Sequence, residues 1–290
     1  MSETSRESGT LLSMRLQNST PEELIPRALD GDLKALESIL ASVKDQIFNL
    51  SIRFLWHPAD AEDACQEILV KIMLNLNRFE FRSAFSTWTY RIAMNYLIDA
   101  KRSRLERLGM EFSMAQQEIA RAASLASNLN QNSAEVMALS DETRLVHEVK
   151  TACSHAMLQC LDRNGRAAFI LGEGFGMDSR DAAFVLNISP EAYRQRLSRA
   201  RKTMDRFLNS NCGLKNTDNP CRCEKRACQV QSSSMLRRYL AYSSQLPIHE
   251  KADLPDSLDR LAWIYRSNTR YIYRNALLDR VRRHLQSSQV

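Results

Sequence analysis

Residues 79–104 read FEFRSAFSTWTYRIAMNYLIDAKRSR, and this stretch decides the fold of the first half of the chain. Its apolar residues and threonines recur at helical spacing and predict a buried helix face. That face holds Phe85, Thr89, Ile92, Ala93, Tyr96, Leu97 and Ala100. A second, polar face holds Thr87, Arg91, Asn95, Asp99 and Arg102. Ser83 or Ser86 is expected to cap the helix, because a short hydroxyl accepts a hydrogen bond from the N–H groups of the first turn.

The loop before this predicted helix and its first turn are rich in aromatic rings that stand next to cations. They hold Phe79, Phe81, Phe85, Trp88 and Tyr90, with Arg82 and Arg91 beside them. Rings stack on unpaired bases and cations pair with phosphates, so the mixture is typical of proteins that bind single-stranded nucleic acid. A solvated face on an ordinary surface helix is the alternative, which the pattern alone leaves open.

The composition predicts an all-α protein, and its charge permits a polyanionic partner. The 290 residues give room for about two domains, and Gly and Pro are scarce, at 8 and 7 residues. A net charge of +6 is compatible with nucleic acid as a partner. No long apolar run and no signal-peptide pattern occur, so we expect no membrane span and a cytoplasmic location.

The stretch FEFRSAFSTWTYRIAMNYLIDAKR resembles the promoter-melting segment of the sigma-70 family of transcription initiation factors, above all that of the extracytoplasmic-function (ECF) group. The resemblance implies that this segment opens and reads the minus-ten promoter element. It assigns that role to Phe81, Trp88, Arg91, Asn95, Asp99, Lys101 and Arg102. It also implies a bacterial initiation factor that binds core RNA polymerase and promoter DNA. Such a protein is not an enzyme and requires no cofactor, since polymerase supplies the chemistry. The sequence leaves open whether an anti-sigma factor is a further partner.

Residues 60–77 predict a long amphipathic helix with one outward patch of interest. Two helices are expected before it, across residues 33–55, and Asp60 is expected to cap it. Its outward side carries Asp63, Gln66, Glu67 and Val70, a mostly acidic patch around an apolar residue. AEDACQEILVKI resembles the polymerase-binding helix of the same family, which implies that this patch docks on core polymerase. A solvated helix face is the alternative.

Residues 179–208 predict a helix-turn-helix, with Asn187-Ile188-Ser189 as the turn and Pro190 opening a basic second helix. DSRDAAFVLNISPEAYRQRLSRARKTM resembles the minus-thirty-five-reading module of the family. The resemblance assigns that element to Ser189, Glu191, Arg194, Gln195, Arg196, Arg199 and Lys202. Two departures leave the base preference open. Ser179 and Arg180 stand where an aromatic residue and an acid are usual, and Tyr193 replaces a small branched residue.

The C-terminal part contains a cluster of cysteines. Cys212, Cys221, Cys223 and Cys228 lie within seventeen residues. In a reducing compartment, four close thiols suit zinc or another thiolate-bound metal. The spacing is not that of strong zinc signatures, so a redox-sensing thiol cluster and unliganded cysteines stay open as alternatives. Cys153 and Cys160 fall on a helical apolar stripe and are expected in the core.

The chain is therefore expected to consist of five parts. They are a disordered N-terminus (1–19), sigma region 2 (20–104), a linker (105–141), sigma region 4 (142–208) and a regulatory extension (209–290). Two other functions compete with this interpretation. A stand-alone helix-turn-helix regulator would leave the aromatic stretch without a use. A metal or thiol sensor is favoured by the cysteine cluster alone.

Overall fold

The structure is a computed structural model that describes residues 19–100, 106–126 and 139–228, together with 237, 240–241, 248–250, 270–271 and 273. Its elements are α2 (Pro21–Leu29), α3 (Leu33–Leu55), α4 (Pro58–Leu74), η1 (Leu76–Arg78), α5 (Phe85–Asp99), η2 (Glu106–Leu108), α6 (Phe112–Ala126), α7 (Leu139–Gln159), α8 (Arg163–Phe169), η4 (Ile170–Gly174), α9 (Ser179–Leu186), α10 (Pro190–Asn211), α11 (Cys223–Cys228), β1 (Ile248–Glu250) and β2 (Arg270–Tyr271). The predicted all-α fold is confirmed, with two short strands added. The predicted disordered segment lies, apart from Ser19, outside the described residues. No helix in the described ranges is both long enough and apolar enough to span a membrane.

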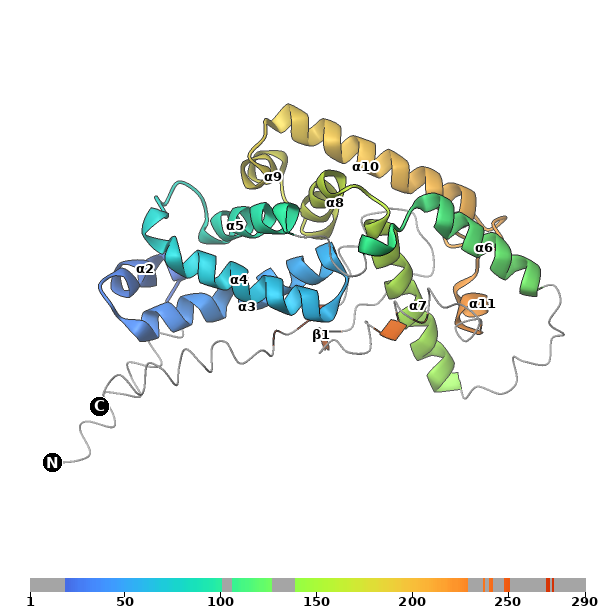
Figure 1. The fold of residues 1–290 in the computed structure, drawn as a ribbon, viewed down its shortest axis with the longest axis horizontal. Coiled ribbons are helices and arrows are strands. Elements are labelled where there is room, and N and C mark those ends of the chain that lie inside the picture. The colour runs from blue at the N-terminus through green and yellow to red at the C-terminus, as the bar shows by residue number, and fades with distance from the viewer. Residues whose placement is uncertain are drawn as a thin grey trace.

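Helices α2 to α5 form an N-terminal bundle around the long helix α3 (Figure 1). Thr20 and Glu23 cap α2 reciprocally, and the Asp32 carboxylate accepts hydrogen bonds from Lys34 N–H and Ala35 N–H at the start of α3. The expectation of two helices across residues 33–55 is wrong, since α3 is one helix of 23 residues. It ends at Trp56, whose φ of 47° takes the chain out of the helical path.

Two predicted caps in this bundle are corrected by contacts that local spacing does not reveal. Helix α4 begins at Pro58, and His57 rather than Asp60 caps it, with Nδ1 accepting the Asp60 N–H at 3.2 Å. Neither Ser83 nor Ser86 caps α5. The carboxylate of Glu22 on α2 accepts the Phe85 N–H at 2.9 Å instead. An acid next to the first turn of a helix is favoured by the helix dipole, so α2 fixes where α5 begins.

Helices α8, α9 and α10 form a second bundle with the predicted helix-turn-helix. Asp178 caps α9, Asn187 ends it with a φ of 53°, and the Ser189 hydroxyl caps α10. Residues 170–174 form a wider π-type turn in which Gly172 lies under α10. A Cβ atom on Gly172 would lie 2.7 Å from the Tyr193 hydroxyl, so the close approach of α10 requires glycine there.

The two bundles pack directly on each other through a buried charge network. Figure 1 shows α5 beneath α8 and α9, with α10 running across them. Arg163 and Arg166 of α8 bind the carboxylate of Glu106 at 2.7 and 2.8 Å. Arg166 also donates to the Phe54 carbonyl of α3 at 2.8 Å. Because charged hydrogen bonds in a buried site are costly to leave unmade, this network favours one arrangement of the two bundles.

Candidate nucleic-acid and polymerase interfaces

Helix α10 presents a basic, solvent-exposed face directly after the turn. Arg194, Gln195, Arg199 and Lys202 are exposed, while Tyr193 and Leu197 on the opposite side are buried. Burial also raises the pKa of Tyr193 to about 12, so this phenol stays neutral inside the bundle. The separation of faces matches a recognition helix, whose first turns reach base edges while later cations meet phosphates.

Four of the predicted minus-thirty-five residues already have partners within the chain. Glu191 accepts a hydrogen bond from Arg194 at 2.6 Å, and the pKa of its carboxyl is lowered by its own backbone N–H and by Arg194. Arg196 is half-buried and lies 3.4 Å from the Asn164 side chain of α8, so it points to the bundle more than the other arginines do. Ser189 is occupied as the helix cap.

The aromatic loop before α5 divides into buried and exposed rings. Phe79 and Phe85 are buried, and Trp88 is half-buried with its ring 5.4 and 5.6 Å from theirs. Phe81 is 55% exposed and has a backbone φ of 56°, a conformation that residues other than glycine rarely adopt. An exposed ring on a stack of buried rings is a ready platform for an unpaired base.

An open cavity of about 490 Å³ lies between α4 and α5, the two helices that flank this loop in the sequence. It is lined by Lys71, Asn75, Ile92, Asn95, Tyr96, Asp99 and Ala100. The lining offers a cation, two amides, a carboxylate and an aromatic ring, which suit the hydrogen-bonding edge and the face of a nucleobase. The structure therefore brings the predicted Asn95 and Asp99 together at one cavity. Lys101 and Arg102 lie outside the described residues.

The predicted polymerase-binding patch lies on the outer side of α4. Asp63 and Glu67 are exposed, and Gln66 and Val70 are half-buried. Tyr96 lines the cavity and lies near Asp63 and Glu67, so the acidic face borders the cavity. Burial and the charges of these two acids raise the pKa of the Tyr96 hydroxyl. The apolar stripe of α4 is buried, as its spacing predicts, and includes Cys65.

Comparison with known proteins assigns both bundles. Residues 39–106 match the sequence family described as sigma-70 region 2, and residues 152–204 match sigma-70, region 4. The ECF RNA polymerase sigma factor SigW of Bacillus subtilis is 38% identical over 80 residues, which cover 28% of this chain and 43% of SigW. The chain thus carries regions 2 and 4 of the sigma-70 family, and its matched relatives include ECF sigma factors.

Longer relatives extend the likeness over both regions. The RNA polymerase sigma-H factor of Pseudomonas aeruginosa is 28% identical over 194 residues, covering 67% of this chain and 96% of the relative. The ECF sigma-E factor of Escherichia coli is 26% identical over 197 residues, covering 64% and 93%. Among solved structures, Bartonella quintana RpoE in complex with the anti-sigma factor NepR matches at 20% identity, with a TM-score of 0.36, over 59% of this chain and 94% of RpoE.

Regions 2 and 4 contact each other at Arg91, one of the residues predicted to read the minus-ten element. Arg91 of α5 donates to the Asn187 side chain in the helix-turn-helix at 3.1 Å, and its guanidinium lies 4.6 Å from the ring centre of Phe184. Tyr90 and Phe175 pack with their ring centres 5.2 Å apart. Sequence reasoning missed this contact, because no local pattern pairs two segments almost a hundred residues apart.

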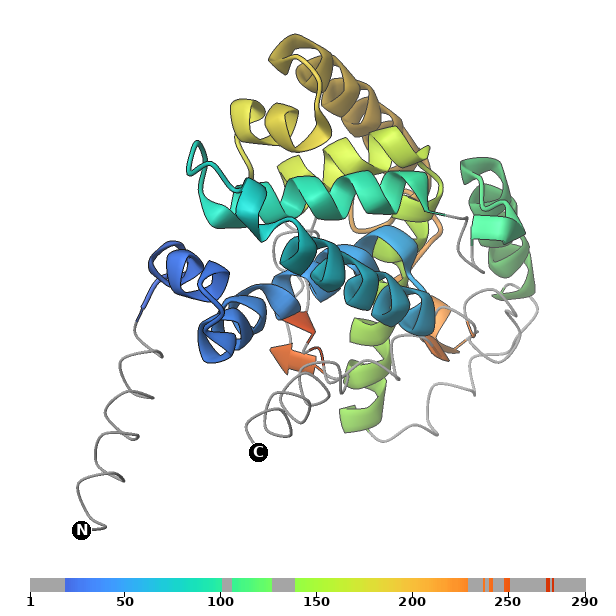
Figure 2. The same ribbon diagram turned by 60° about the vertical axis from the view of Figure 1, so that its left-hand side comes forward.

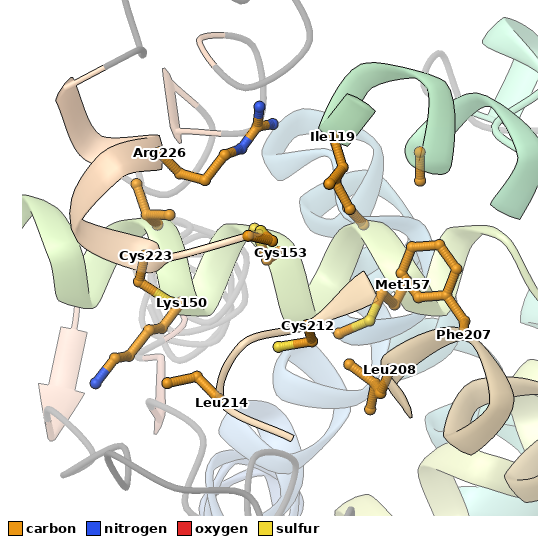
Figure 3. Close-up of a pocket in the computed structure, with 14 residues that line it drawn as sticks. Ile119, Lys150, Cys153, Met157, Phe207, Leu208, Cys212, Leu214, Cys223 and Arg226 are labelled. Atoms are coloured by element: carbon orange, nitrogen blue, oxygen red, sulfur yellow. The ribbon is translucent and has the colours of Figure 1, made fainter. Parts of the chain in front are cut away.

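The tail cysteines meet a cysteine of region 4. Cys153, Cys212, Cys221 and Cys223 all line one largely apolar cavity of about 100 Å³. Figure 3 shows Cys153 on α7 facing this space, with Cys212 and Cys223 around it. The side chain of Cys228 lies outside the described residues. Within the described part, no three His, Cys, Asp or Glu side chains are arranged to hold a metal ion. Burial raises the pKa of Cys153 to about 12 and also raises that of Cys221, so these thiols are protonated near neutral pH.

Proposed function

We propose that this protein is a promoter-specificity subunit that recruits core RNA polymerase and opens promoter DNA. The observation that carries the proposal is the presence of two different reading surfaces in one chain. Helix α10 presents an exposed basic face after a helix-turn-helix, and α5 presents an aromatic loop and a polar cavity on a separate bundle. A duplex reader needs the first surface alone, whereas promoter opening needs both.

Each surface has a distinct physical task in this proposal. Helix α10 enters the major groove at the minus-thirty-five element, with Arg194 and Gln195 at base edges and Arg199 and Lys202 at phosphates. Phe81, Trp88 and the cavity with Asn95 and Asp99 take unpaired minus-ten bases, and stacking offsets the few kcal/mol that unstacking a base costs. The patch of α4 with Asp63, Gln66, Glu67 and Val70 docks on core polymerase. In this role the chain performs no catalysis itself, requires no cofactor and acts in the cytoplasm.

Two regulatory inputs belong to the same proposal and rest on different support. The cysteine cluster supplies soft ligands for zinc or a similar metal if the tail closes around it, with Cys228 or Cys153 as the fourth thiol. The second input is an anti-sigma factor as a further partner. Neither input is needed for promoter recognition.

In vitro transcription with purified core polymerase tests the proposed function. The wild-type chain should direct initiation from members of a promoter library, and Asn95→Ala and Trp88→Ala should reduce open complexes more than duplex binding. Losing one stacked or pocketed base should cost about 1–3 kcal/mol. Lys225→Ala, an exposed residue of α11, is the matched surface control.

The outcomes separate the proposal from the stand-alone regulator. Permanganate reactivity at the minus-ten bases with polymerase present supports promoter opening. Sequence-specific duplex binding without any stimulation of transcription would instead identify a helix-turn-helix regulator that acts alone. Helicity measured by circular dichroism shows whether Trp88→Ala, which truncates a half-buried ring, remains folded.

A further inference from the structure

The C-terminal strand of the chain is held on α3 by hydrogen bonds to its backbone. The Asn49 amide donates to the Tyr271 carbonyl at 2.7 Å and accepts the Tyr271 N–H at 2.9 Å. The Asp45 carboxylate accepts the Tyr273 N–H at 2.9 Å, and the Lys44 ammonium donates to the Tyr273 carbonyl at 3.3 Å. Two consecutive turns of α3 thus bind the backbone of this segment in the way that a neighbouring strand would.

Two aromatic side chains anchor this strand. Tyr271 is 1% exposed, and the ring of Tyr273 lies 5.5 Å from that of Phe48 between centres. On its other side, β2 pairs antiparallel with β1, where Tyr271 is opposite Ile248. Figure 2 shows the two short strands under α3. Buried rings together with paired backbone groups are the features of a specific docking site and not of a loose surface contact.

The docked strand, unlike the α3 residues that hold it, lies outside the regions that match the sigma-70 family. The matched regions end at residue 204, and 67% of this chain already accounts for 96% of the sigma-H factor. The strand is thus an addition to the part of the chain that matches the family, and the tail acts here as a ligand supplied by the same chain.

The same helix joins the strand to region 4. Arg53, one turn beyond Asn49, lies with its guanidinium 4.9 Å from the ring centre of Phe175 in region 4. Trp56 stacks on His155 of α7 with ring centres 3.6 Å apart. In this arrangement the Arg91 side chain of α5 donates a hydrogen bond to the side chain of Asn187, in the turn of the helix-turn-helix. We call this contact between α5 and the turn the closed arrangement.

We propose that residues 44–49 of α3 form a docking site for the chain's own segment with Tyr271 and Tyr273, and that the docked segment holds regions 2 and 4 in the closed arrangement. The strand fixes the middle of α3 while the end of α3 carries region 4, so releasing the strand frees the helix end to move. Release of the strand uncovers both Arg91 and the turn of the helix-turn-helix. The consequence for DNA binding rests on the proposed function, whereas the conformational coupling does not.

Hydrogen–deuterium exchange on the full chain tests the coupling. Tyr271→Ala removes the anchor, and Asn49→Ala removes both hydrogen bonds to the Tyr271 peptide. Each should raise the exchange of residues 184–189 by about fivefold or more, which is the usual lower range of coupling between distant sites. The double variant should show no further increase, because both changes break one contact.

Two further variants keep the test decisive. Tyr271→Phe retains the ring and removes a hydroxyl that has no hydrogen-bond partner among the described residues, so it should behave as wild type. If Tyr271→Ala loses helicity, Asp45→Ala releases the Tyr273 end from a side chain that is 48% exposed, without disturbing the core. Faster exchange in the strand with unchanged exchange at 184–189 would overturn the proposal.

A separate readout distinguishes this inference from the proposed function. Binding of promoter DNA by the full chain without polymerase should strengthen by about fivefold or more in Tyr271→Ala and Asn49→Ala. Coupling seen by exchange, together with a wild-type chain that never supports transcription, would retain the docked strand and remove the promoter role. Normal transcription without coupling in the exchange experiment would retain the promoter role and remove the proposed role of the docked strand.

Discussion

At the residue scale, Gly172 decides how closely α10 can pack on the rest of region 4. A methyl group there would lie 2.7 Å from the Tyr193 hydroxyl and 2.9 Å from a Leu197 methyl. Both side chains are buried, and the Tyr193 hydroxyl is hydrogen-bonded to the Ala168 carbonyl at 3.3 Å, so neither can move away freely.

We therefore expect Gly172→Ala to lower the free energy of unfolding by about 1–3 kcal/mol, as overpacking in a core does. Urea denaturation followed by circular dichroism measures it. Gly174→Ala is the matched control, because its nearest heavy atom would be an ordinary 3.8 Å away. Equal effects of the two changes would show that α10 tolerates the extra methyl group.

A second residue, His155, makes the contact between the regions sensitive to pH. Its ring is fully buried on Trp56, and neither ring nitrogen has a hydrogen-bond partner among the described residues. Burial and the nearby Arg53 hold its pKa well below the ordinary value of 6.5. In the unfolded chain the same histidine takes up a proton near that value.

The unfolded state consequently binds more protons below about pH 6.5, and the free energy of unfolding falls as the pH falls. A drop from neutral pH to one unit below that value should cost about 1.4 kcal/mol from this residue. His155→Phe keeps the stacked ring but cannot titrate, so the loss between pH 7.5 and 5.5 should shrink by that amount. Urea titrations at the two pH values measure it, and an unchanged loss in the variant would assign the acid sensitivity to other groups.

At the scale of single elements, α10 separates base reading from phosphate binding along its length. Arg194→Ala and Gln195→Ala should relax sequence preference, at about 1–3 kcal/mol for each good base contact. Lys202→Ala should weaken binding to all sequences and reduce the salt slope by about one. Affinity measured across a promoter panel at several salt concentrations tests the division. A uniform change in all three variants would contradict it.

Helix α4 likewise divides into a buried stripe and an outer acidic patch. Reversing the charge of the exposed Asp63 and Glu67 to lysine should weaken binding to core polymerase at least tenfold, about 1.4 kcal/mol, while helicity stays unchanged. Asp218 and Glu224, exposed acids outside the matched regions, give the charge-matched control. A titration of labelled chain with core polymerase measures the affinity. The same affinity in both double variants would remove this face of α4 from the interface.

At the scale of the whole molecule, the cysteine tail and region 4 form one unit around a shared cavity. The loop after α10 brings Cys212 and Cys221 into a parallel backbone bridge, and Cys153 of α7 lines the same space. Such an arrangement joins the end of the recognition helix to the tail, so any ligand of the thiols would also act on region 4.

We predict about one tightly bound metal per chain under reducing conditions, with affinity that rises with pH because thiols of raised pKa must lose their protons to bind. Elemental analysis of purified protein measures the content. Cys221→Ser with Cys223→Ser should remove it, whereas Cys160→Ser, which lies outside the cavity lining, should not. If the purified protein holds no stoichiometric metal at any pH, the metal site is ruled out, and the thiols serve as redox groups or as packing residues.

The sequence by itself determined what depends on residues within a few turns of one another. Helical spacing located the buried face of α4 and part of that of α5. Thr87, expected on the polar face of α5, is buried, whereas Ile92 and Tyr96, expected on the buried face, line the open cavity. Thr20, Asp32, Asp178 and Ser189 cap their helices by accepting an N–H two or three residues away, which is a contact of the same local kind. The helix-turn-helix and the family could be read from motifs of the same local kind. The residues assigned to polymerase and DNA stay predictions.

Only the tertiary structure decided the contacts between segments far apart in the chain. Glu22 caps α5, Glu106 binds Arg166, Arg91 binds Asn187, and Asn49 holds Tyr271. Each of these is a polar group whose partner is fixed by how whole helices pack, and packing depends on the shape and burial of many side chains at once. Local periodicity carries no information about which helix face meets which, so the closed arrangement and the docked strand became visible only in the folded molecule.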